Sequence, residues 1–193
     1  LKSFYKIKRT IANTGYIEAV TWSFMDEKIA KLLSSNVIKI KNPISADLDV
    51  MRPSNIPNLL VAVNQNKSKM ISSGKLFEVG PIFDETLLDK QANVASGIAY
   101  GNISSNNWNS LKKDFDVFDI KSDLMSILKS LNVPIDNLNY DSINNKVFHP
   151  GKSSSLRIGK NIIANFGELN PILLKSLDIS NIVVAFEIFT ESL

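Results

Sequence analysis

Hydrophobic residues recur along this chain with two periods, one typical of amphipathic helices and one typical of half-buried strands. Spacings of three and four residues predict helices at 3–14, 26–33, 54–70, 116–131 and 170–177. Alternation with polar or small residues, or a short apolar run, predicts strands at 18–24, 37–40, 76–79, 82–83, 94–100, 154–158, 163–166 and 182–189. Val20, Trp22 and Phe24 would share one face of the 18–24 strand, and Met70 would be the last buried position of its helix.

Capping and turn residues set the expected ends of these elements. Gly15 follows the first helix as a left-handed cap, and Asp116 is the expected cap of the clearest helix. Gly159 begins a hairpin turn. Gly80-Pro81 is expected to separate the strands on either side of it. The small face of the 94–100 strand predicts that a helix or another backbone packs closely there.

Strands joined by hairpins, with helices segregated between them, predict an α+β fold, with a largely antiparallel β-sheet flanked by helices. We expect a single domain over residues 1–193, with the polar stretch 102–113 as a candidate boundary. No apolar run approaches the roughly 20 residues needed to span a membrane. Because the chain opens at Leu1 without an initiator methionine or a signal peptide, we interpret it as a fragment of a longer chain.

The composition excludes several chemistries. The 193 residues include no cysteine and one histidine, which excludes disulfides, thiolate nucleophiles, cysteine-ligated metals and multi-histidine metal centres. The formal net charge of +3 is small and spread along the chain, so it gives little support for a dedicated nucleic-acid surface. The arginines are Arg9, Arg52 and Arg157, and this scarcity argues against a bidentate phosphate clamp.

Candidate catalytic residues are few. His149 lies in a Phe-His-Pro-Gly turn without an identifiable nucleophile or orienting carboxylate, so we interpret it as a turn histidine bonded to nearby backbone. Glu78, Glu168 and Glu187 lie in or beside strands and could meet as a metal or acid–base cluster, although exposed or ion-paired positions are the simpler interpretation. The sequence therefore names no catalytic residue, no cofactor-binding residue and no metal ligand.

Two phosphate-binding patterns can be weighed in the same way. Residues 151–154 read Gly-Lys-Ser-Ser, like the end of a phosphate loop, but the required first glycine is missing and a strand follows, so we reject this site. Lys67, Lys69 and Lys75 with Arg52 form a modest basic zone that could contact RNA phosphates. A solvated helix face is the simpler interpretation, because no aromatic residues interleave with the zone for base stacking.

A series of short segments runs through nearly the whole chain. Among them are Gly-Tyr-Ile-Glu-Ala-Val-Thr-Trp-Ser-Phe at 15–24, Leu-Phe-Glu-Val-Gly at 76–80, Phe-His-Pro-Gly-Lys-Ser at 148–153 and Gly-Glu-Leu-Asn-Pro at 167–171. The others lie at 9–10, 42–48, 51–54, 57–60, 64–66 and 116–121. In order and spacing, they resemble the central class II synthetase-like core of the bacterial phenylalanine–tRNA ligase beta subunit.

The chain departs from that family where Pro81 and Lys152 stand at positions that usually carry arginine. A working class II site needs an arginine after the acidic residue to hold the ATP α-phosphate, and a glycine-rich segment ending in a second arginine. After Glu78 no cation occurs until Lys90, and 183–189 carries neither glycine nor arginine. The resemblance therefore implies a core that keeps the fold and has lost the site.

The resemblance also implies a partner. The chain would scaffold a catalytic alpha subunit in a cytoplasmic (αβ)2 enzyme that ligates phenylalanine to its tRNA with ATP and Mg2+, while this fragment binds no cofactor itself. Its first helix and the following strand occupy the place of class II motif 1, the dimerisation element. We therefore expect exposed apolar surface on Phe4, Ile7 and Ile11 to face the alpha subunit, an expectation that fails if these side chains are buried within one chain.

A different class of function stays open, namely a free-standing synthetase-like paralogue that regulates another enzyme or binds a metabolite. A well-formed pocket with convergent polar groups would favour the paralogue, and a collapsed, apolar-filled pocket would favour the scaffold. A hydrolase that uses His149 is the third interpretation.

Overall fold

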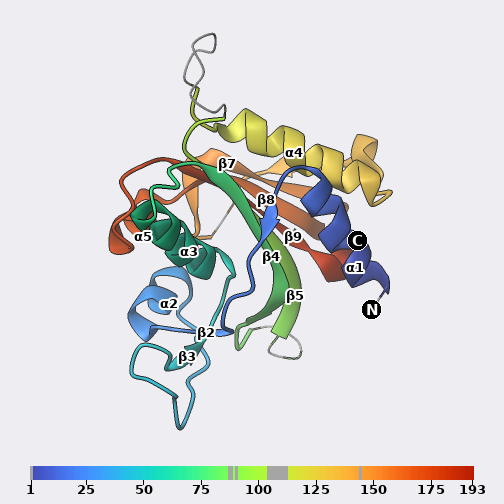
Figure 1. Cartoon of the computed structure of the whole chain (residues 1–193). Helices are drawn as coiled ribbons and strands as arrows, with labels where there is room; N and C mark the ends of the chain where they lie inside the picture. Colours follow the sequence, from blue (N-terminus) through green and yellow to red (C-terminus); the bar gives the residue numbers. More distant parts are fainter. Residues whose placement is uncertain (1, 87–88, 90, 104–112, 144) are drawn as a thin grey trace.

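The computed structural model describes residues 2–86, 89, 91–103, 113–143 and 145–193 (Figure 1). Most of the candidate boundary at 102–113 lies outside these residues, as does Lys90. The helices are α1 (Lys2–Asn13), α2 (Glu27–Leu33), α3 (Ile56–Ser68), α4 (Val117–Ser130) and α5 (Pro171–Ser176). The strands are β1 (Ile17–Glu18), β2 (Phe24–Met25), β3 (Val50–Met51), β4 (Gly74–Phe83), β5 (Gln91–Tyr100), β6 (Asn139–Asp141), β7 (Phe148–Ile158), β8 (Asn161–Leu169) and β9 (Val183–Phe189).

Seven strands form one sheet in the order β1-β4-β5-β9-β8-β7-β6, and β2 pairs with β3 separately. β1 runs parallel to β4, and the other pairs in the large sheet are antiparallel. β9 lies between β5 and β8, the central position that its apolar run predicts. The expected α+β fold with a largely antiparallel sheet flanked by helices is confirmed.

Helices cover both faces of the sheet and create two apolar cores (Figure 1). On one face, α1 and α4 pack against the sheet, with Ile11, Leu124 and Phe186 in the shared core. On the other face, α3 and α5 pack against it, with Leu60 and Leu173 in the shared core. The face that carries α3 also holds the buried polar groups described below.

Local capping follows the sequence closely. Asp116 accepts hydrogen bonds from the backbone N–H groups of Phe118 and Asp119, and Asp119 accepts one in return from the N–H of Asp116. This capping box fixes the start of α4. Gly15 has φ +87°, the left-handed conformation expected just beyond α1.

The apolar stripe of α1 packs inward. Ile7 and Ile11 are 4% and 0% exposed in a core shared with the sheet and α4, and Phe4 packs against the same core. The expectation that these side chains present exposed surface to a partner is therefore wrong for Ile7 and Ile11. A stripe of this spacing has the same pattern whether it faces its own sheet or another subunit.

The continuous strand expected at 18–24 is not formed. β1 ends at Glu18 and β2 begins at Phe24, and between them Val20 and Trp22 are 85% and 66% exposed. The backbone N–H of Thr21 donates to Oε1 of Glu78 at 3.3 Å. A side-chain carboxylate thus takes the hydrogen bond that a neighbouring strand would otherwise accept.

Two further expectations are wrong at the ends of elements. The strand expected at 37–40 reduces to an isolated bridge between Lys39 and Val50. Met70 is exposed rather than buried, because α3 ends at Ser68 and Met70 adopts a left-handed φ of 65°. Neither change affects the apolar face of α3, which is buried as predicted.

Gly80-Pro81 does not divide its strand either. β4 continues from Gly74 to Phe83, with Pro81 opposite Asn93 of β5. The carbonyl oxygen of Pro81 accepts a hydrogen bond from Nε of Arg52 at 2.9 Å. Because the nitrogen and carbonyl of one strand residue point to the same side, the proline nitrogen also faces Arg52, and its missing N–H costs no bond to β5.

The small face of β5 accommodates aromatic rings at its centre rather than a helix or backbone. Gly97 lies opposite Phe186, and a Cβ at Gly97 would overlap the Phe186 ring and come within 3.1 Å of the Tyr16 ring. These two rings pack edge to face, with centroids 5.5 Å apart. Since both are buried, neither has space to move aside.

We therefore expect Gly97→Ala to lower the free energy of unfolding by about 1–3 kcal/mol, as overpacking does in other cores. Urea denaturation would measure it. Gly151→Ala is the matched control, because the nearest heavy atom to its added Cβ is 3.7 Å away on His149, and its effect should stay within about 0.5 kcal/mol. Equal stability of the two variants would contradict the packing described for Gly97.

Candidate functional site

A row of polar side chains crosses the sheet on the face that carries α3. Cross-strand register places Glu78 beside Ser96, Ser96 beside Glu187, Glu187 beside Asn165, and Asn165 beside Ser155. Residues paired in this way point to the same face, so the row continues over five strands. All five side chains are buried, with exposures of 0–6%. Buried polar groups need partners, and these partners define the chemistry of the face.

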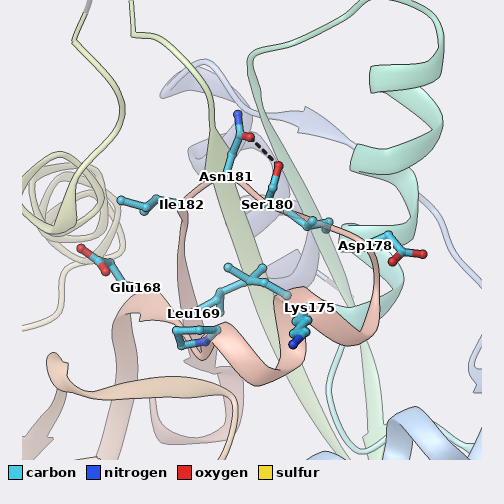
Figure 2. A pocket seen from close by; sticks show the side chains of 10 residues that line it. Glu168, Leu169, Lys175, Asp178, Ser180, Asn181 and Ile182 are labelled. Atoms are coloured by element: carbon cyan, nitrogen blue, oxygen red, sulfur yellow. Dashed lines mark hydrogen bonds between the residues drawn. The ribbon is translucent and has the colours of Figure 1, made fainter.

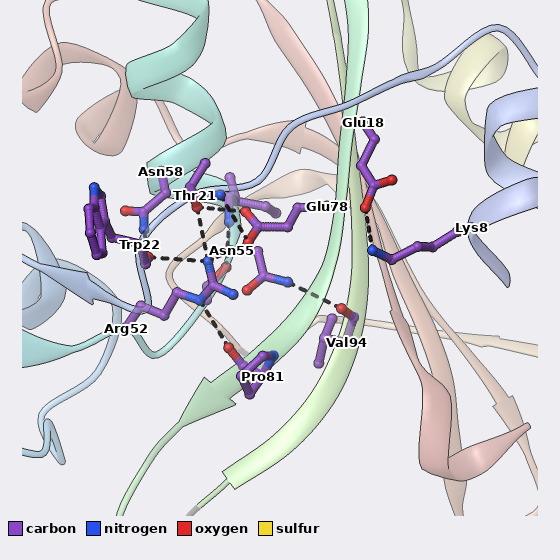
Figure 3. Close-up of polar contacts among 12 residues, drawn as sticks. Lys8, Glu18, Thr21, Trp22, Arg52, Asn55, Asn58, Glu78, Pro81 and Val94 are labelled. Atoms are coloured by element: carbon purple, nitrogen blue, oxygen red, sulfur yellow. Dashed lines mark hydrogen bonds and ion pairs between the residues drawn. The ribbon is translucent and has the colours of Figure 1, made fainter. Parts of the chain in front are cut away.

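At one end of the row, Glu78 forms a buried ion pair with Arg52 (Figure 3). Nη1 of Arg52, a residue 1% exposed, lies 2.8 Å from Oε1 of Glu78 and 3.0 Å from Oγ1 of Thr21. The Thr21 hydroxyl donates to Oε2 of Glu78 at 2.6 Å. Gly80 leaves room for the guanidinium, because a Cβ there would lie 2.6 Å from Nη2. The cation and the carboxylate therefore satisfy one another within the protein.

In the middle of the row, Glu187 contacts the residues that precede α3. The Ser54 hydroxyl donates to Oε1 of Glu187 at 2.6 Å and accepts from the backbone N–H of Ile56 at 3.1 Å. Nδ2 of Asn55 donates to the carbonyl oxygen of Val94 at 3.2 Å. The start of α3 is thereby fixed to β5 and β9. Burial raises the pKa of Glu187 to about 7, against the smaller opposing effect of the Ser54 hydrogen bond.

The far end of the row is a neutral pair. The Ser155 hydroxyl donates to Oδ1 of Asn165 at 2.8 Å. Along the row, side chains of the chain itself supply the partners of both buried glutamates: Arg52 and Thr21 for Glu78, and Ser54 for Glu187. Within the described part of the chain, Oγ of Ser96 and Oδ1 of Asn55 are buried without a hydrogen-bond partner, whereas both glutamates of the row contact the chain itself.

The three carboxylates considered as a cluster do not come together. Glu78 and Glu187 share a face but are separated by Ser96 in the register. Glu168 lies on β8 and pairs with Lys152, with distances of 3.0 and 2.9 Å to its two oxygens. The ion-paired interpretation is confirmed for Glu78 and Glu168. For Glu187 it is wrong, because its partner is the hydroxyl of Ser54.

The interpretation of His149 as bonded to local backbone is confirmed. Its Nδ1 accepts from the backbone N–H of Gly151 at 3.0 Å. His149 is the second residue of β7 instead of lying in a turn, and residues 151–154 continue the same strand. No helix follows them, in agreement with the rejected phosphate loop.

The basic zone does not form as one surface. Arg52 is buried, and Nζ of Lys75 lies 2.6 Å from Oδ2 of Asp123 and over the rings of Tyr16 and Phe115, in the other core. Lys75 thus lies on the face that α1 and α4 cover, whereas Lys67 belongs to α3, which covers the opposite face.

The described residues hold no group of three histidine, cysteine, aspartate or glutamate side chains that could bind a metal ion. Within the same residues, none of the helices has the length and apolarity to cross a membrane. On the sheet face, the guanidinium of Arg52 contacts Glu78, and the carboxyl of Glu187 contacts the hydroxyl of Ser54.

An open cavity of about 510 Å³ lies beside α5 (Figure 2). Its charged lining residues are Glu168, Lys175 and Asp178, which come from a strand, a helix and the loop after it. Figure 2 shows these three side chains pointing in different directions. Convergent polar groups are what a metabolite site needs, so this cavity gives the paralogue interpretation little support.

The sequence pattern missed Ser54, Asn55 and Thr21 as members of the site. Ser54 is separated from Glu187 by 133 positions and Thr21 from Glu78 by 57. A serine just before a helix signals only a cap. Ser96 and Glu187 interrupt otherwise apolar strands. These two positions are the sequence signal that the sheet face beneath α3 is not purely apolar.

Comparison with known proteins decides the family. The model of the phenylalanyl tRNA synthetase beta chain CLM domain matches residues 2–190. The chain belongs to this family. Phenylalanine–tRNA ligase beta subunits of Rhodospirillum rubrum and Paramagnetospirillum magneticum are 38% and 37% identical over 189 residues, which is 97% of this chain and 24% of each relative. The chain thus spans about a quarter of the length of the curated relatives it matches.

Solved structures agree on the fold. Two structures of pyrrolysyl tRNA synthetase from Desulfitobacterium hafniense superpose with TM-scores of 0.74 and 0.72, covering 98% of this chain and 66% of each of theirs. Their sequence identities are 13% and 12%. The class II synthetase-like architecture expected for this beta-chain core is confirmed.

The buried carboxyl of Glu187 predicts a pH dependence of stability. Its pKa is about 7 when folded against an ordinary value of 4.5, so the folded protein binds more protons between these pH values. The free energy of unfolding should therefore fall by about 3 kcal/mol from this group as pH rises from 4.5 to 7. Glu187→Gln should remove that slope and Glu168→Gln should keep it, as urea titrations across this range would measure. An unchanged slope in Glu187→Gln would contradict the neutral buried state.

The ion pair of Arg52 and Glu78 predicts strong coupling. Arg52→Met and Glu78→Gln should each cost about 3–5 kcal/mol, because each leaves a buried polar partner unpaired. The double variant should lose clearly less than the sum. The pair of Lys152 and Glu168, in which the lysine side chain is 52% exposed, is the control, where the same cycle should give less than about 1 kcal/mol. Additive losses at Arg52 and Glu78, measured by denaturant unfolding, would rule out the coupling.

Proposed function

We propose that residues 1–193 form the single non-catalytic core of a phenylalanine–tRNA ligase beta subunit and that this core scaffolds the catalytic alpha subunit. In the proposed (αβ)2 assembly, the whole cytoplasmic enzyme uses ATP and Mg2+ to join phenylalanine to its tRNA. Membership of the CLM-domain family supports the beta-subunit role. The high coverage of this chain by beta-subunit relatives supports the same assignment.

The internal engagement of Arg52 on the sheet face is the observation that carries the non-catalytic part of the proposal. Stabilising a nucleotide in a reaction requires cationic groups directed at its phosphates. Here the guanidinium of Arg52 is engaged by Glu78, Thr21 and the carbonyl oxygen of Pro81. Ser54 and Asn55 occupy the adjacent part of the face. The residues present do not fit ATP with Mg2+, and no step of the reaction is assigned to them.

The scaffolding part of the proposal rests on exposed apolar surface. Ile17, Val20 and Trp22 are large, exposed and close in sequence, just after α1. β1 is also an edge strand of the sheet, a position that proteins usually protect or pair. Tyr5 adds an exposed aromatic side chain on the outer side of α1. This surface replaces the buried Ile7 and Ile11 as the proposed contact with the alpha subunit.

Co-expression of the beta chain, in its natural length, with the cognate alpha subunit tests the proposal. We expect a stable complex in size-exclusion chromatography with equal amounts of both chains. The complex should catalyse phenylalanine-dependent exchange between ATP and pyrophosphate, and the beta chain alone should not. A folded beta chain that forms no complex would overturn the scaffold, and exchange by the beta chain alone would overturn its non-catalytic role.

A further inference from the structure

We propose that a groove between residues 19–25, α2 and α3 docks a segment of the alpha subunit that carries apolar side chains beside a lysine or arginine. The inference rests on the proposed function and names the chemistry of the partner at this surface. The groove has a volume of about 580 Å³. Its apolar lining includes Val20, Trp22, Phe24, Leu48, Pro57 and Val61.

The aromatic lining is exposed yet held in place. Trp22 is 66% exposed, and its ring stacks on Phe24 with centroids 6.5 Å apart and planes 20° from parallel. The carbonyl oxygen of Trp22 accepts from Nδ2 of Asn58 at 2.6 Å and from Nη1 of Arg52 at 3.3 Å (Figure 3). An exposed tryptophan on a fixed backbone loses little conformational freedom on binding. Such aromatic anchors carry much of the affinity of protein interfaces.

The rest of the exposed apolar surface lies on both sides of this anchor. Val20 is 85% exposed on the same segment, and Val61 is 42% exposed on α3 across the groove. Burying these side chains together with Trp22 would remove a contiguous apolar area from water. The groove is therefore suited to apolar side chains of a protein segment.

The charges at the groove select the remaining chemistry of the partner. Among the residues that the structure describes, the lining has two ionisable side chains, Asp26 and Asp47, and no lysine, arginine or histidine. Asp26 accepts from the backbone N–H of Lys28 at 2.6 Å and caps α2, so its position is fixed. Asp47 is exposed. Two carboxylates beside apolar surface attract a basic side chain and repel nucleic-acid phosphates.

We assign the groove to the alpha subunit, because the groove is continuous with the surface proposed above for that subunit. The groove begins at Val20, three residues after the exposed Ile17 of edge strand β1, which belongs to the surface proposed above for the alpha subunit. One partner can therefore cover the edge and the groove together. A second copy of this chain is the competing occupant and is an outcome of the test.

Binding of the natural-length beta chain to the alpha subunit, measured by biolayer interferometry, tests the groove. Trp22→Ala should weaken Kd by about 30-fold, in line with other tryptophan anchors. Asp47→Lys should weaken it by about tenfold at low salt and by less at about 0.5 M salt, because salt screens exposed charges. Two matched controls lie away from the groove. Phe118→Ala replaces an exposed aromatic side chain on α4, and Asp136→Lys reverses a charge in the segment after α4. Both variants should bind the alpha subunit as the unchanged chain does.

A photo-crosslinking amino acid in place of Val61 identifies the segment that enters the groove. The crosslinked alpha-subunit peptide should contain apolar residues next to a lysine or arginine, and reversing that charge to glutamate should restore binding to Asp47→Lys. If the unchanged chains form no complex, the proposed function and the groove fail together. If they do, but Trp22→Ala and Asp47→Lys bind as tightly as the controls, the groove alone is overturned. Trp22-dependent self-association without alpha-subunit binding also overturns it, in favour of a second copy.

Discussion

The buried ion pair of Arg52 and Glu78 is the constraint on which the architecture around it depends. Removing both charges from water is costly, and the cost is offset only when every polar atom finds a partner. Thr21 and the carbonyl oxygens of Trp22 and Pro81 provide those partners. The segment after β1 therefore follows the carboxylate of Glu78 and not a neighbouring strand, and proline is tolerated within β4. One interaction sets the conformation of three segments that are far apart in the chain.

The same pair engages the guanidinium that lies on the sheet face. A surface that stabilises phosphate groups must direct cationic groups at them. In this chain the guanidinium of Arg52 and the carboxyl of Glu187 contact the protein itself, through Glu78 and Ser54. Arginine is scarce in this chain, and Arg52, the arginine that lies on the sheet face, is already paired with Glu78. A cation held by an internal carboxylate cannot also bind a phosphate without leaving that carboxylate buried and unpaired.

Features with local causes could be predicted from the sequence, and features that depend on distant partners could not. The capping box at Asp116, the left-handed Gly15 and the hairpin at Gly159 all follow from neighbouring residues, and the apolar run of β9 gave its central place. The strand expected at 18–24 does not form, because the backbone N–H of Thr21 bonds to the side chain of Glu78, 57 positions away. The small face of β5 was misassigned because Phe186 comes from another strand. The sequence was sufficient to predict that Glu78 and Glu168 are ion-paired. It was not sufficient to predict that their partners are Arg52 and Lys152.

Because the apolar side of α1 packs inward, a contact with the alpha subunit must use another surface. The ion pair of Arg52 and Glu78 explains why the segment after β1 is suited to that contact. A stripe of apolar residues at helical spacing cannot distinguish the chain's own sheet from another subunit, and here Ile7 and Ile11 bury it within the chain. The apolar side chains that stay exposed, Val20 and Trp22, lie on the segment after β1, which Arg52 and Glu78 hold in place. Such a segment would be poor as a mobile loop, because ordering it on binding would consume part of the binding free energy. In the proposed contact with the alpha subunit, a segment fixed by buried charges would present Trp22 without that cost, because Arg52 binds both Glu78 and the carbonyl oxygen of Trp22.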